Sequence, residues 1–478
     1  MEYPLFEVPG VGGGLLIAAV AIVHVVIAHF AVGGGFFMAI AHTLAVRRGD
    51  ALLARYVKDH AQFLVLLAFV SGALTGVGIW FAIGIVSPAA TSRLIHNFFW
   101  GWAAEWCCFA VEIVAGYVYY YGFHRLRPRQ HLVVVWVYAV AAFLSLAIIN
   151  GILTFMLTPS RWAEMIRGRE AFHADWAFWL GLFNATYWPS LLMRSVSCLA
   201  LAAIFVAVIV NLRANYTREE RQRIINLGAY FMAPLALMIP AGVWYFAELP
   251  PAAQAKIQGG AVAMTLFFMF GLAASLLIAG YAYFGLIRGG RYINLETSLL
   301  LLAIAFIATG SMEFVREGVR KPYVIQDVLY SNGVPTYDGW PQRLQNEGGL
   351  VFMPFARAPG QSVADIRALP LHESGAYVYR AQCRACHEID GFNGIRPLVA
   401  GKSRKLLLSI LHELDAYGYM PPFLGDDYEM RALTEHLLKL SLGEAYVPIS
   451  DEEYEKLLGD AGSRPREGAG GASGGEAG

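Results

Sequence analysis

The chain has 478 residues, of which 57% are hydrophobic and only 15% are charged, and its mean hydropathy is +0.49. Soluble globular proteins carry roughly 25% charged residues, so this composition excludes an ordinary soluble protein and indicates one that lies mostly in a membrane. The 36 basic and 36 acidic residues balance, which gives no reason to expect a nucleic-acid partner, and five cysteines are too few for a disulfide framework.

Eight apolar runs are long enough to cross a hydrocarbon core of about 30 Å. The first run is longer than the apolar core of a cleavable signal peptide, which is about 7–15 residues, so we expect it to stay in the lipid bilayer. The sequence therefore predicts an all-α fold, a polytopic bundle of about eight transmembrane helices. The runs cover residues 13–46, 61–87, 95–122, 132–158, 187–212, 224–247, 260–287 and 294–315.

The loops between these runs differ in charge. Alternate loops, starting with the one after residue 46, hold thirteen Lys and Arg residues, whereas the remaining loops hold five. Short loops rich in Lys and Arg stay in the cytoplasm. The pattern predicts a multi-pass protein of the bacterial cytoplasmic membrane, with its N-terminus and its C-terminal part on the periplasmic side.

The composition changes after the eighth run. Residues 1–320 form the predicted bundle, and residues 321–371, rich in Pro, Gly and Asn, predict a periplasmic loop or linker. Residues 372–445 predict a small soluble domain. The tail, 446–478, has almost no apolar content beyond about residue 463, and this predicts disorder there.

The strongest motif lies in the small domain. Cys383, Cys386 and His387 form a C-x-x-C-H pattern, in which two thiols bind a haem covalently and the histidine is an axial ligand. Met420 follows 33 residues later and offers a sixth ligand, and apolar residues at helical spacing flank it. The sequence predicts a periplasmic cytochrome c domain with one covalent haem c.

Two alternatives to this interpretation concern the ligands. A zinc or redox site could use the same cysteines, but it would give Met420 no role. Other histidines could compete with Met420, although each is more simply interpreted as a surface histidine. They are His372, His412 and His436.

Ionisable groups in the membrane runs are costly and therefore suggest function. The first run carries His24, His29 and His42. His24 and His42 share a helix face but lie about 27 Å apart along the axis, so they cannot bind one iron. His42, beside Arg47, is interpreted as an interfacial histidine.

Carboxylates occur in the third and eighth runs. Glu105 and Glu112 are seven residues apart and so lie on one helix face, where they could relay protons or hold an iron site; the alternative is a buried pair satisfied by its neighbours. Glu317 and Arg320 lie at the end of the eighth run, where arginines could bind haem propionates. The alternative there is an ordinary charged helix end.

The order of several short motifs resembles subunit I of the cytochrome bd quinol oxidase family. The resemblance covers about residues 10–325. Its motifs are His24, the helix from Glu112 to Gly122-Phe-His-Arg125, Asn150-Gly151, and Glu317-Gly-Val-Arg320-Lys-Pro322-Tyr.

This resemblance implies cofactors and ligands. His24 looks like the axial ligand of a high-spin b haem, with Glu317 on the opposite face. Glu112, and Glu105 one register off the family position, look like the carboxylates near the oxygen-reducing haem and its proton path. Met269 looks like a ligand of a low-spin b haem. One or more non-covalent haems b or d and a second membrane subunit are therefore expected.

The chain departs from the family pattern in three ways. The partner ligand of Met269 would fall where the chain has Met193 and Arg194, so either Met193 is a second methionine ligand or the low-spin haem is absent. The external quinol-binding loop is reduced to about 248–258, too short for a conventional quinol site. The ninth helix is replaced by the cytochrome c domain.

Three functions fit these features. The favoured one is a cytochrome c-linked reductase of oxygen or another small acceptor, in which haem c receives electrons from a periplasmic partner and passes them to membrane b-type or d-type haem. It is favoured because Glu105 and Glu112 are retained. The alternatives are a redox conduit subunit without oxidase activity and a membrane-anchored cytochrome c carrier without membrane haem.

Overall fold

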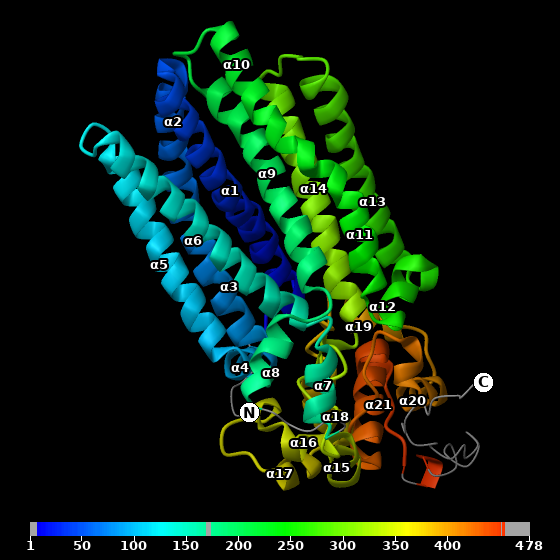
Figure 1. The fold of residues 1–478 in the computed structure, drawn as a ribbon. Coiled ribbons are helices and arrows are strands. Elements are labelled where there is room, and N and C mark those ends of the chain that lie inside the picture. Colours follow the sequence, from blue (N-terminus) through cyan, green and yellow to red (C-terminus); the bar gives the residue numbers. More distant parts are fainter. Residues whose placement is uncertain (1–6, 169–173, 451, 455–478) are drawn as a thin grey trace, which may run out of the picture. The chain divides into compact units, whose positions relative to one another are not determined.

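The computed structural model describes residues 7–168, 174–450 and 452–454, and most of the predicted disordered tail lies outside this range. The chain forms two compact units, Met1–Pro341 and Gln342–Gly478. The first unit contains the long helices drawn in blue to yellow-green in Figure 1, and the second contains short helices.

Long helices that run side by side make up the first unit, as Figure 1 shows. Apolar side chains on the inner side of these helices pack against one another, and apolar side chains on the outer side of most helices are exposed. The elements are α1 (Gly13–Arg48), α2 (Ala51–Leu64), η1 (Val65–Gly72), α3 (Ala73–Val86), α4 (Pro88–Asn97), α5 (Phe99–Gly122), α6 (Pro128–Phe155), α7 (Ser160–Ile166), α8 (Ala174–Leu182), α9 (Tyr187–Leu212), α10 (Arg218–Ala229), η2 (Tyr230–Leu237), α11 (Met238–Ala247), α12 (Pro251–Ala255), η3 (Lys256–Gly260), α13 (Val262–Gly280), η4 (Tyr281–Ile287), α14 (Leu295–Arg320), β1 (Tyr323–Ile325) and β2 (Leu329–Tyr330).

Seven helices of the described residues are long and apolar enough to cross a membrane, and an eighth crossing results if α4 and α5 count as one bent span. Three of the seven are continuous spans built from more than one element: 51–86, 218–247 and 262–287. The predicted all-α polytopic bundle is thus confirmed. The predicted span 95–122 is not a single helix, because its first residues belong to α4, which meets α5 at an angle of 85°.

The bend between α4 and α5 occurs at Phe98, whose φ of −121° and ψ of 29° are not helical. The Phe98 side chain is 1% exposed and contacts the rings of Phe155 and Phe178. Burial of a phenylalanine side chain contributes roughly 2–3 kcal/mol. This packing therefore holds the bend in place.

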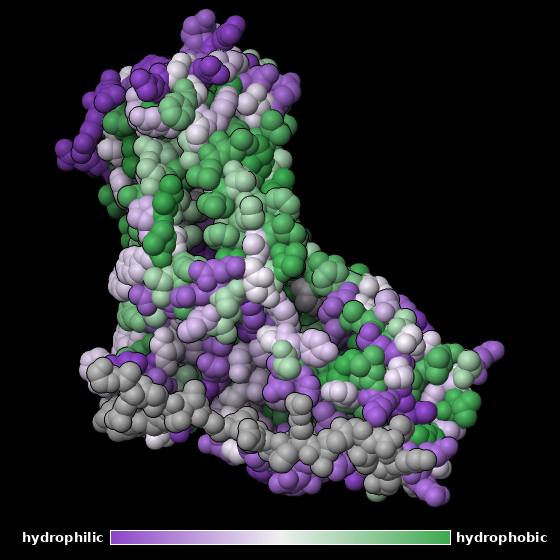
Figure 2. All heavy atoms as spheres, turned by 90° about the vertical axis from the view of Figure 1, so that its right-hand side faces the viewer, coloured by the Kyte–Doolittle hydropathy of each residue, from purple (hydrophilic) through white to green (hydrophobic). Residues whose placement is uncertain are grey.

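The core of the first unit lies around α1 and α9. In α9, 72% of the most apolar window is buried, whereas the corresponding fraction is between 17% and 33% in the other spans. On the face shown in Figure 2, the exposed sides of the long helices form a hydrophobic stretch in the middle of the bundle, below a hydrophilic end. Such a stretch suits a lipid bilayer.

The second unit is a small helical assembly. Its helices α18 and α21 cross at Gly375, where an added Cβ atom would lie only 1.9 Å from the Ala432 carbonyl oxygen, so only glycine allows this close approach. The predicted linker 321–371 contains β1 and β2 of the first unit, the helix α15 across the boundary, and α16, η5 and α17 of the second unit. The elements are α15 (Trp340–Glu347), which begins at the boundary, α16 (Gly349–Phe352), η5 (Pro354–Ala356), α17 (Val363–Arg367), α18 (Leu371–Gln382), α19 (Ile395–Val399), α20 (Arg404–His412), η6 (Leu414–Tyr417), α21 (Asp427–Leu442) and η7 (Gly443–Ala445).

Candidate functional site

The C-x-x-C-H residues lie in one tight turn at the end of α18. Cys383 is the residue that caps the C-terminus of this helix. Its carbonyl oxygen accepts hydrogen bonds from the backbone N–H groups of Cys386, at 3.1 Å, and of His387, at 2.9 Å. The turn thereby gathers both thiols and the imidazole within five residues.

The hydrogen bond of His387 fixes which ring nitrogen is available to a metal. Its Nδ1 lies 3.1 Å from the carbonyl oxygen of Asn393. Because a carbonyl oxygen only accepts, Nδ1 carries the proton and Nε2 keeps its lone pair. Metal-binding histidines are oriented in this way, so the geometry of His387 fits an iron ligand.

Asn393 holds this turn together and was not singled out by the sequence analysis. Its side-chain amide donates to the Cys386 carbonyl oxygen at 2.7 Å, while its own carbonyl accepts from His387. Its φ is +51°, a conformation that asparagine tolerates better than most residues. The signal available in the sequence was the turn-forming pair Asn393-Gly394 after the motif.

Further contacts hold the turn in place. Arg384 and Glu388 form an ion pair with little exposure, and the Tyr379 hydroxyl donates to the His387 carbonyl oxygen at 2.8 Å. Burial raises the pKa of the Cys383 thiol to about 12 and lowers the pKa of His387. Both groups are therefore neutral near pH 7, and a neutral imidazole is the form that binds iron.

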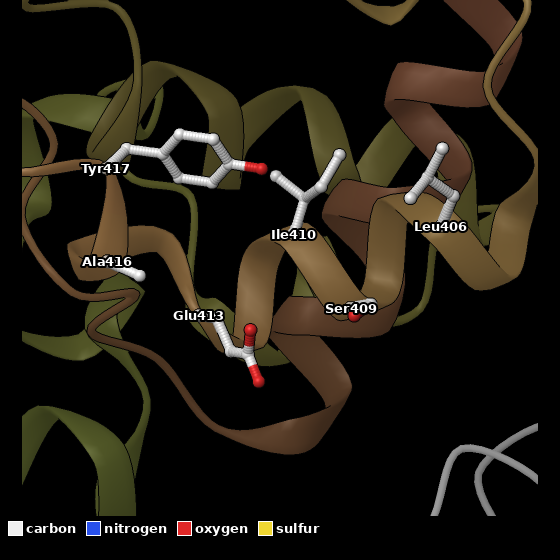
Figure 3. Close-up of a pocket in the computed structure, with 6 residues that line it drawn as sticks. All are labelled: Leu406, Ser409, Ile410, Glu413, Ala416 and Tyr417. Carbon is white, nitrogen blue, oxygen red and sulfur yellow. The ribbon is translucent and has the colours of Figure 1, made fainter.

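Met420 lies in the loop between η6 and α21 and is half-buried. A hollow of about 210 Å³ lies beside η6, where the Tyr417 ring points toward Ile410 in Figure 3. None of the predicted haem residues lines this hollow. Its lining residues are Leu406, Ser409, Ile410, Glu413, Ala416 and Tyr417.

His436, interpreted from sequence as a surface histidine, is half-buried on α21. Its Nδ1 donates to the His372 carbonyl oxygen at 3.1 Å, and its ring centroid lies 5.7 Å from that of Tyr379. Its Nε2 is buried and has no hydrogen-bond partner among the described residues. The interpretation as a surface residue was therefore wrong, because α18 covers this side of α21.

In the first unit, His24 of α1 is oriented by Thr75 of α3. The His24 Nδ1 and the Thr75 hydroxyl are 3.0 Å apart, and this hydroxyl donates its proton to the Ser71 carbonyl oxygen at 2.7 Å. The Thr75 oxygen therefore accepts from His24 Nδ1–H, which leaves Nε2 available. Gly76 makes room for the ring, because a Cβ there would lie 3.1 Å from the His24 Cε1 atom.

Ion pairs surround the C-terminal end of α14. Glu317 pairs with Arg320 and with Lys321, and 48% of its side chain is exposed although it belongs to a membrane-spanning helix. Glu313 lies 2.8 Å from Arg316 and 3.5 Å from Arg194 of α9. Arg320 is 3% exposed at its side chain, and its Nε has no hydrogen-bond partner among the described residues.

This region holds more positive than negative charge. The ion pairs and hydrogen bonds at this end of α14 involve five cationic side chains and two carboxylates. The two propionates of a haem would suit such a region. The residues are Arg194, Arg316, Arg320, Lys256 and Lys321, with Glu313 and Glu317.

The predicted carboxylate pair lies on the α5 side that meets α6. Glu105 accepts a hydrogen bond from the Ser145 hydroxyl at 2.9 Å. Glu112 is 8% exposed and interacts with the Tyr138 hydroxyl. Both carboxylates therefore have partners on α6.

The two methionines lie on different helices. Met269 is on α13, and 58% of it is exposed on the outer face of that helix. Met193 is on α9 and half-buried, one residue before the ion-paired Arg194. The predicted short external loop contains α12 and η3.

The donor sets suit haem better than a bare metal ion. Within the described ranges, no three His, Cys, Asp or Glu side chains form a group that could hold a metal ion. What occurs instead is a single imidazole with a free Nε2, at His24 and at His387, together with excess arginine. Haem needs only one or two protein ligands and a partner for its propionates.

Comparisons with known proteins agree with this picture for the first unit. Residues 15–258, about half of the chain, match the family model described as cytochrome bd terminal oxidase subunit I. The structure of bd oxidase from Geobacillus thermodenitrificans is similar in fold, with a TM-score of 0.56 and 15% sequence identity over 65% of this chain and 87% of that chain. No curated protein matches the chain.

Proposed function

Because the chain belongs to the cytochrome bd terminal oxidase subunit I family, we propose that it is the electron-accepting subunit of a membrane respiratory oxidoreductase. Electrons would enter through the second unit from a periplasmic protein and would reduce oxygen, or another small acceptor, in the first. The observation that carries this proposal is the combination of a bd-type bundle with the ordered turn of Cys383, Cys386 and His387 in one chain.

The proposed ligands follow from these geometries. Cys383 and Cys386 would bind haem c covalently, and His387 and Met420 would be its axial ligands. In the first unit, His24 and Glu317 would hold a b-type or d-type haem. Bound haem would supply the iron that carries electrons and binds oxygen.

The protein's own side chains would manage charge and protons. Arg316 and Arg320 would neutralise carboxylates of the cofactor, because they lie in a region with excess positive charge. Glu112 would hold and deliver protons, since it is a buried carboxylate that faces the Tyr138 hydroxyl. Glu105, seven residues before Glu112 on the same face of α5, would extend this path through Ser145.

The proposed setting is the bacterial cytoplasmic membrane, with the second unit in the periplasm. The excess of Lys and Arg in alternate loops supports this orientation. The external segment of α12 and η3 is short, so we propose that electrons do not come from a quinol bound in a long loop. A second membrane subunit would complete the complex.

Oxygen consumption by the purified full-length protein tests the proposal. With reduced cytochrome c as donor, we expect the Glu112→Gln variant to consume oxygen at least about 10-fold more slowly, because proton transfer by a placed group contributes roughly 10²–10⁴-fold. Glu164→Gln is the matched control, since Glu164 is exposed on α7. Native protein that consumes no oxygen would reject an oxidase role, and equal rates for the native and Glu112→Gln proteins would reject Glu112 as its proton-delivering group.

A redox conduit without oxidase activity is the second candidate. It is favoured because the expected ligands of a low-spin haem are poorly placed. Arg194 forms an ion pair at the position expected for one ligand, and Met269, the other, faces outward. Carbon monoxide distinguishes the two, because an oxidase needs an open iron position. An unchanged spectrum of the reduced protein after carbon monoxide addition would favour the conduit.

A further inference from the structure

A cluster of two histidines and a tyrosine lies between α1, α5 and α6, at the end of the bundle where α1 reaches Arg47 and Arg48. His42, Tyr119 and His131 are 8%, 1% and 5% exposed, respectively. Burial of these polar side chains in a membrane bundle costs free energy, and apolar phenylalanine side chains would fill the same space without that cost. The function described so far does not use this cluster.

The three side chains are directly connected. The His42 Nδ1 is 2.9 Å from the Tyr119 hydroxyl, and the His131 Nε2 donates to the Tyr119 backbone carbonyl at 2.8 Å. The two imidazole centroids are 4.9 Å apart. Because His131 Nε2 carries a proton, its Nδ1 has the free lone pair, and the Tyr119 hydroxyl can both give and accept a proton.

This cluster continues the pattern that holds Glu105 and Glu112. On α5, the residues at 105, 112 and 119 are spaced by seven, and so are their partners at 145, 138 and 131 on the antiparallel α6. Each step of seven residues spans about 10 Å along the helix. We call these three pairs the α5–α6 ladder: Glu105–Ser145, Glu112–Tyr138 and Tyr119–His131.

Each step of the ladder is about 10 Å long, so a proton would cross it through roughly three water molecules hydrogen-bonded at about 2.8 Å each. The Tyr138 ring fills part of the step between Glu112 and Tyr119, because it packs against Gly35 and Gly116, and its hydroxyl donates to the Ala31 carbonyl oxygen at 3.2 Å. Tyr138 thus places a hydroxyl group near Glu112.

The Phe123 ring lies between the cluster and charged groups at the rim of the bundle. The Phe123 ring lies 4.5 Å from that of His131 and 6.3 Å from that of His42. The Lys58 Nζ lies 6.0 Å from the Phe123 ring and 3.3 Å from the Nε2 of the exposed His124. Titratable groups thus stand on both sides of Phe123.

We propose that His42, Tyr119 and His131 form a proton-loading site, at which protons from the arginine-rich side enter the α5–α6 ladder on their way to Glu112. The inference rests on the proposed function, because it gives that reaction its proton source. One imidazole takes a proton from water at the rim. The His42 Nδ1 gives its proton to the Tyr119 hydroxyl, and this hydroxyl gives its own proton to water on the way to Glu112.

Proton uptake during reduction tests this site in the full-length holoprotein. The oxidised protein is mixed rapidly, without oxygen, with the one-electron reductant hexaammineruthenium(II), whose oxidation releases no protons. The weak buffer contains a pH indicator, and proton uptake and haem absorbance are followed together. Tyr119→Phe removes only the hydroxyl, and His131→Gln can keep a donor to the Tyr119 carbonyl but does not titrate near pH 7. We expect uptake at least about 10-fold slower in both, with unchanged haem content.

The control is His96→Gln, since His96 is an exposed histidine on α4. It should take up protons at the native rate. Uptake within twofold of the native rate in Tyr119→Phe and His131→Gln would overturn the proposal and leave the cluster as a structural bridge. Native protein that takes up no protons on reduction would overturn it as well.

The two proposals fail separately. A native protein that consumes no oxygen but whose proton uptake depends on Tyr119 refutes the oxidase role and retains the loading site. Normal oxygen consumption by Tyr119→Phe and His131→Gln refutes the loading site and retains the oxidase role.

Discussion

Asn393 shows how a single residue can organise a cofactor turn. Its side chain and its carbonyl group each bind one residue of the C-x-x-C-H motif, Cys386 and His387 respectively. Its positive φ brings both groups to the same side of the loop. The orientation of His387 therefore depends on a residue outside the motif.

Substitution of Asn393 separates the backbone effect from the side-chain effect. Asn393→Ala loses a hydrogen bond and adds strain at φ +51°, so we expect a loss of about 2 kcal/mol. Asn393→Gly loses only the hydrogen bond, so the loss should be about 1 kcal/mol. Denaturant midpoints, followed by haem c absorbance in the full-length protein, measure both, and equal losses would contradict strain at this position.

The sequence supports the identity of individual ligands better than their surroundings. C-x-x-C-H names its own residues, and His24 stands out as an ionisable group in an apolar run. The partners of such residues cannot be identified from the local sequence, because Thr75 is 51 residues from His24 and Tyr119 is 77 residues from His42. His42, interpreted as interfacial, is buried because α5 and α6 close over it, and no local pattern encodes that contact.

At the scale of elements, one carboxylate connects two helices of the second unit. Glu429, in the first turn of α21, is fully buried and accepts the backbone N–H groups of Gly349, at 2.7 Å, and Leu350, at 2.9 Å, at the start of α16. These are N–H groups without partners inside their own helix. Glu429 therefore fixes α16 to α21.

This connection should depend on pH. Burial, with a smaller contribution from Asp426, raises the pKa of Glu429 from 4.5 to about 7, against the opposing effects of the two N–H groups and Arg367. The folded protein thus binds this proton more tightly than the unfolded chain. The resulting stabilisation is complete below about pH 4.5 and is lost as pH rises through 7, about 3 kcal/mol in all.

The Glu429→Gln variant tests that dependence, because glutamine stays neutral. We expect the denaturant midpoint of the native protein to fall between pH 5 and pH 8, and that of Glu429→Gln to fall less. Glu373→Gln, at an exposed position of α18, should behave like the native protein. A native midpoint that does not change over this range would refute the role of Glu429.

Helix positions were largely predictable from apolar runs, and their ends were not. The run 13–46 corresponds closely to α1, which ends at Arg48 because Gly49 adopts φ +64°. The second span begins ten residues before its apolar run, at Ala51, because Asp50 caps an amphipathic helix there. The bend at Phe98 depends on Phe155 and Phe178, which are distant in sequence.

At the scale of the whole molecule, the chain consists of two units with separate interiors. The first is built on α1 and α9, and the second on the crossing of α18 and α21 at Gly375. Residues proposed to hold the non-covalent haem all belong to the first unit, and those proposed to hold haem c all belong to the second. Loss of either cofactor should therefore leave the other site intact.

Haem quantification in variants of the intact protein tests this independence. We expect Cys383→Ser with Cys386→Ser to abolish covalent haem and to keep extractable haem near its native amount, because neither cysteine contributes to the core of the first unit. His24→Phe should do the opposite, since it removes the nitrogen that Thr75 orients. Pyridine haemochrome spectra of the extracted and the protein-bound fractions measure both haems. Native protein with covalent haem alone would mean that the bundle carries no cofactor, and the chain would then be an anchored cytochrome.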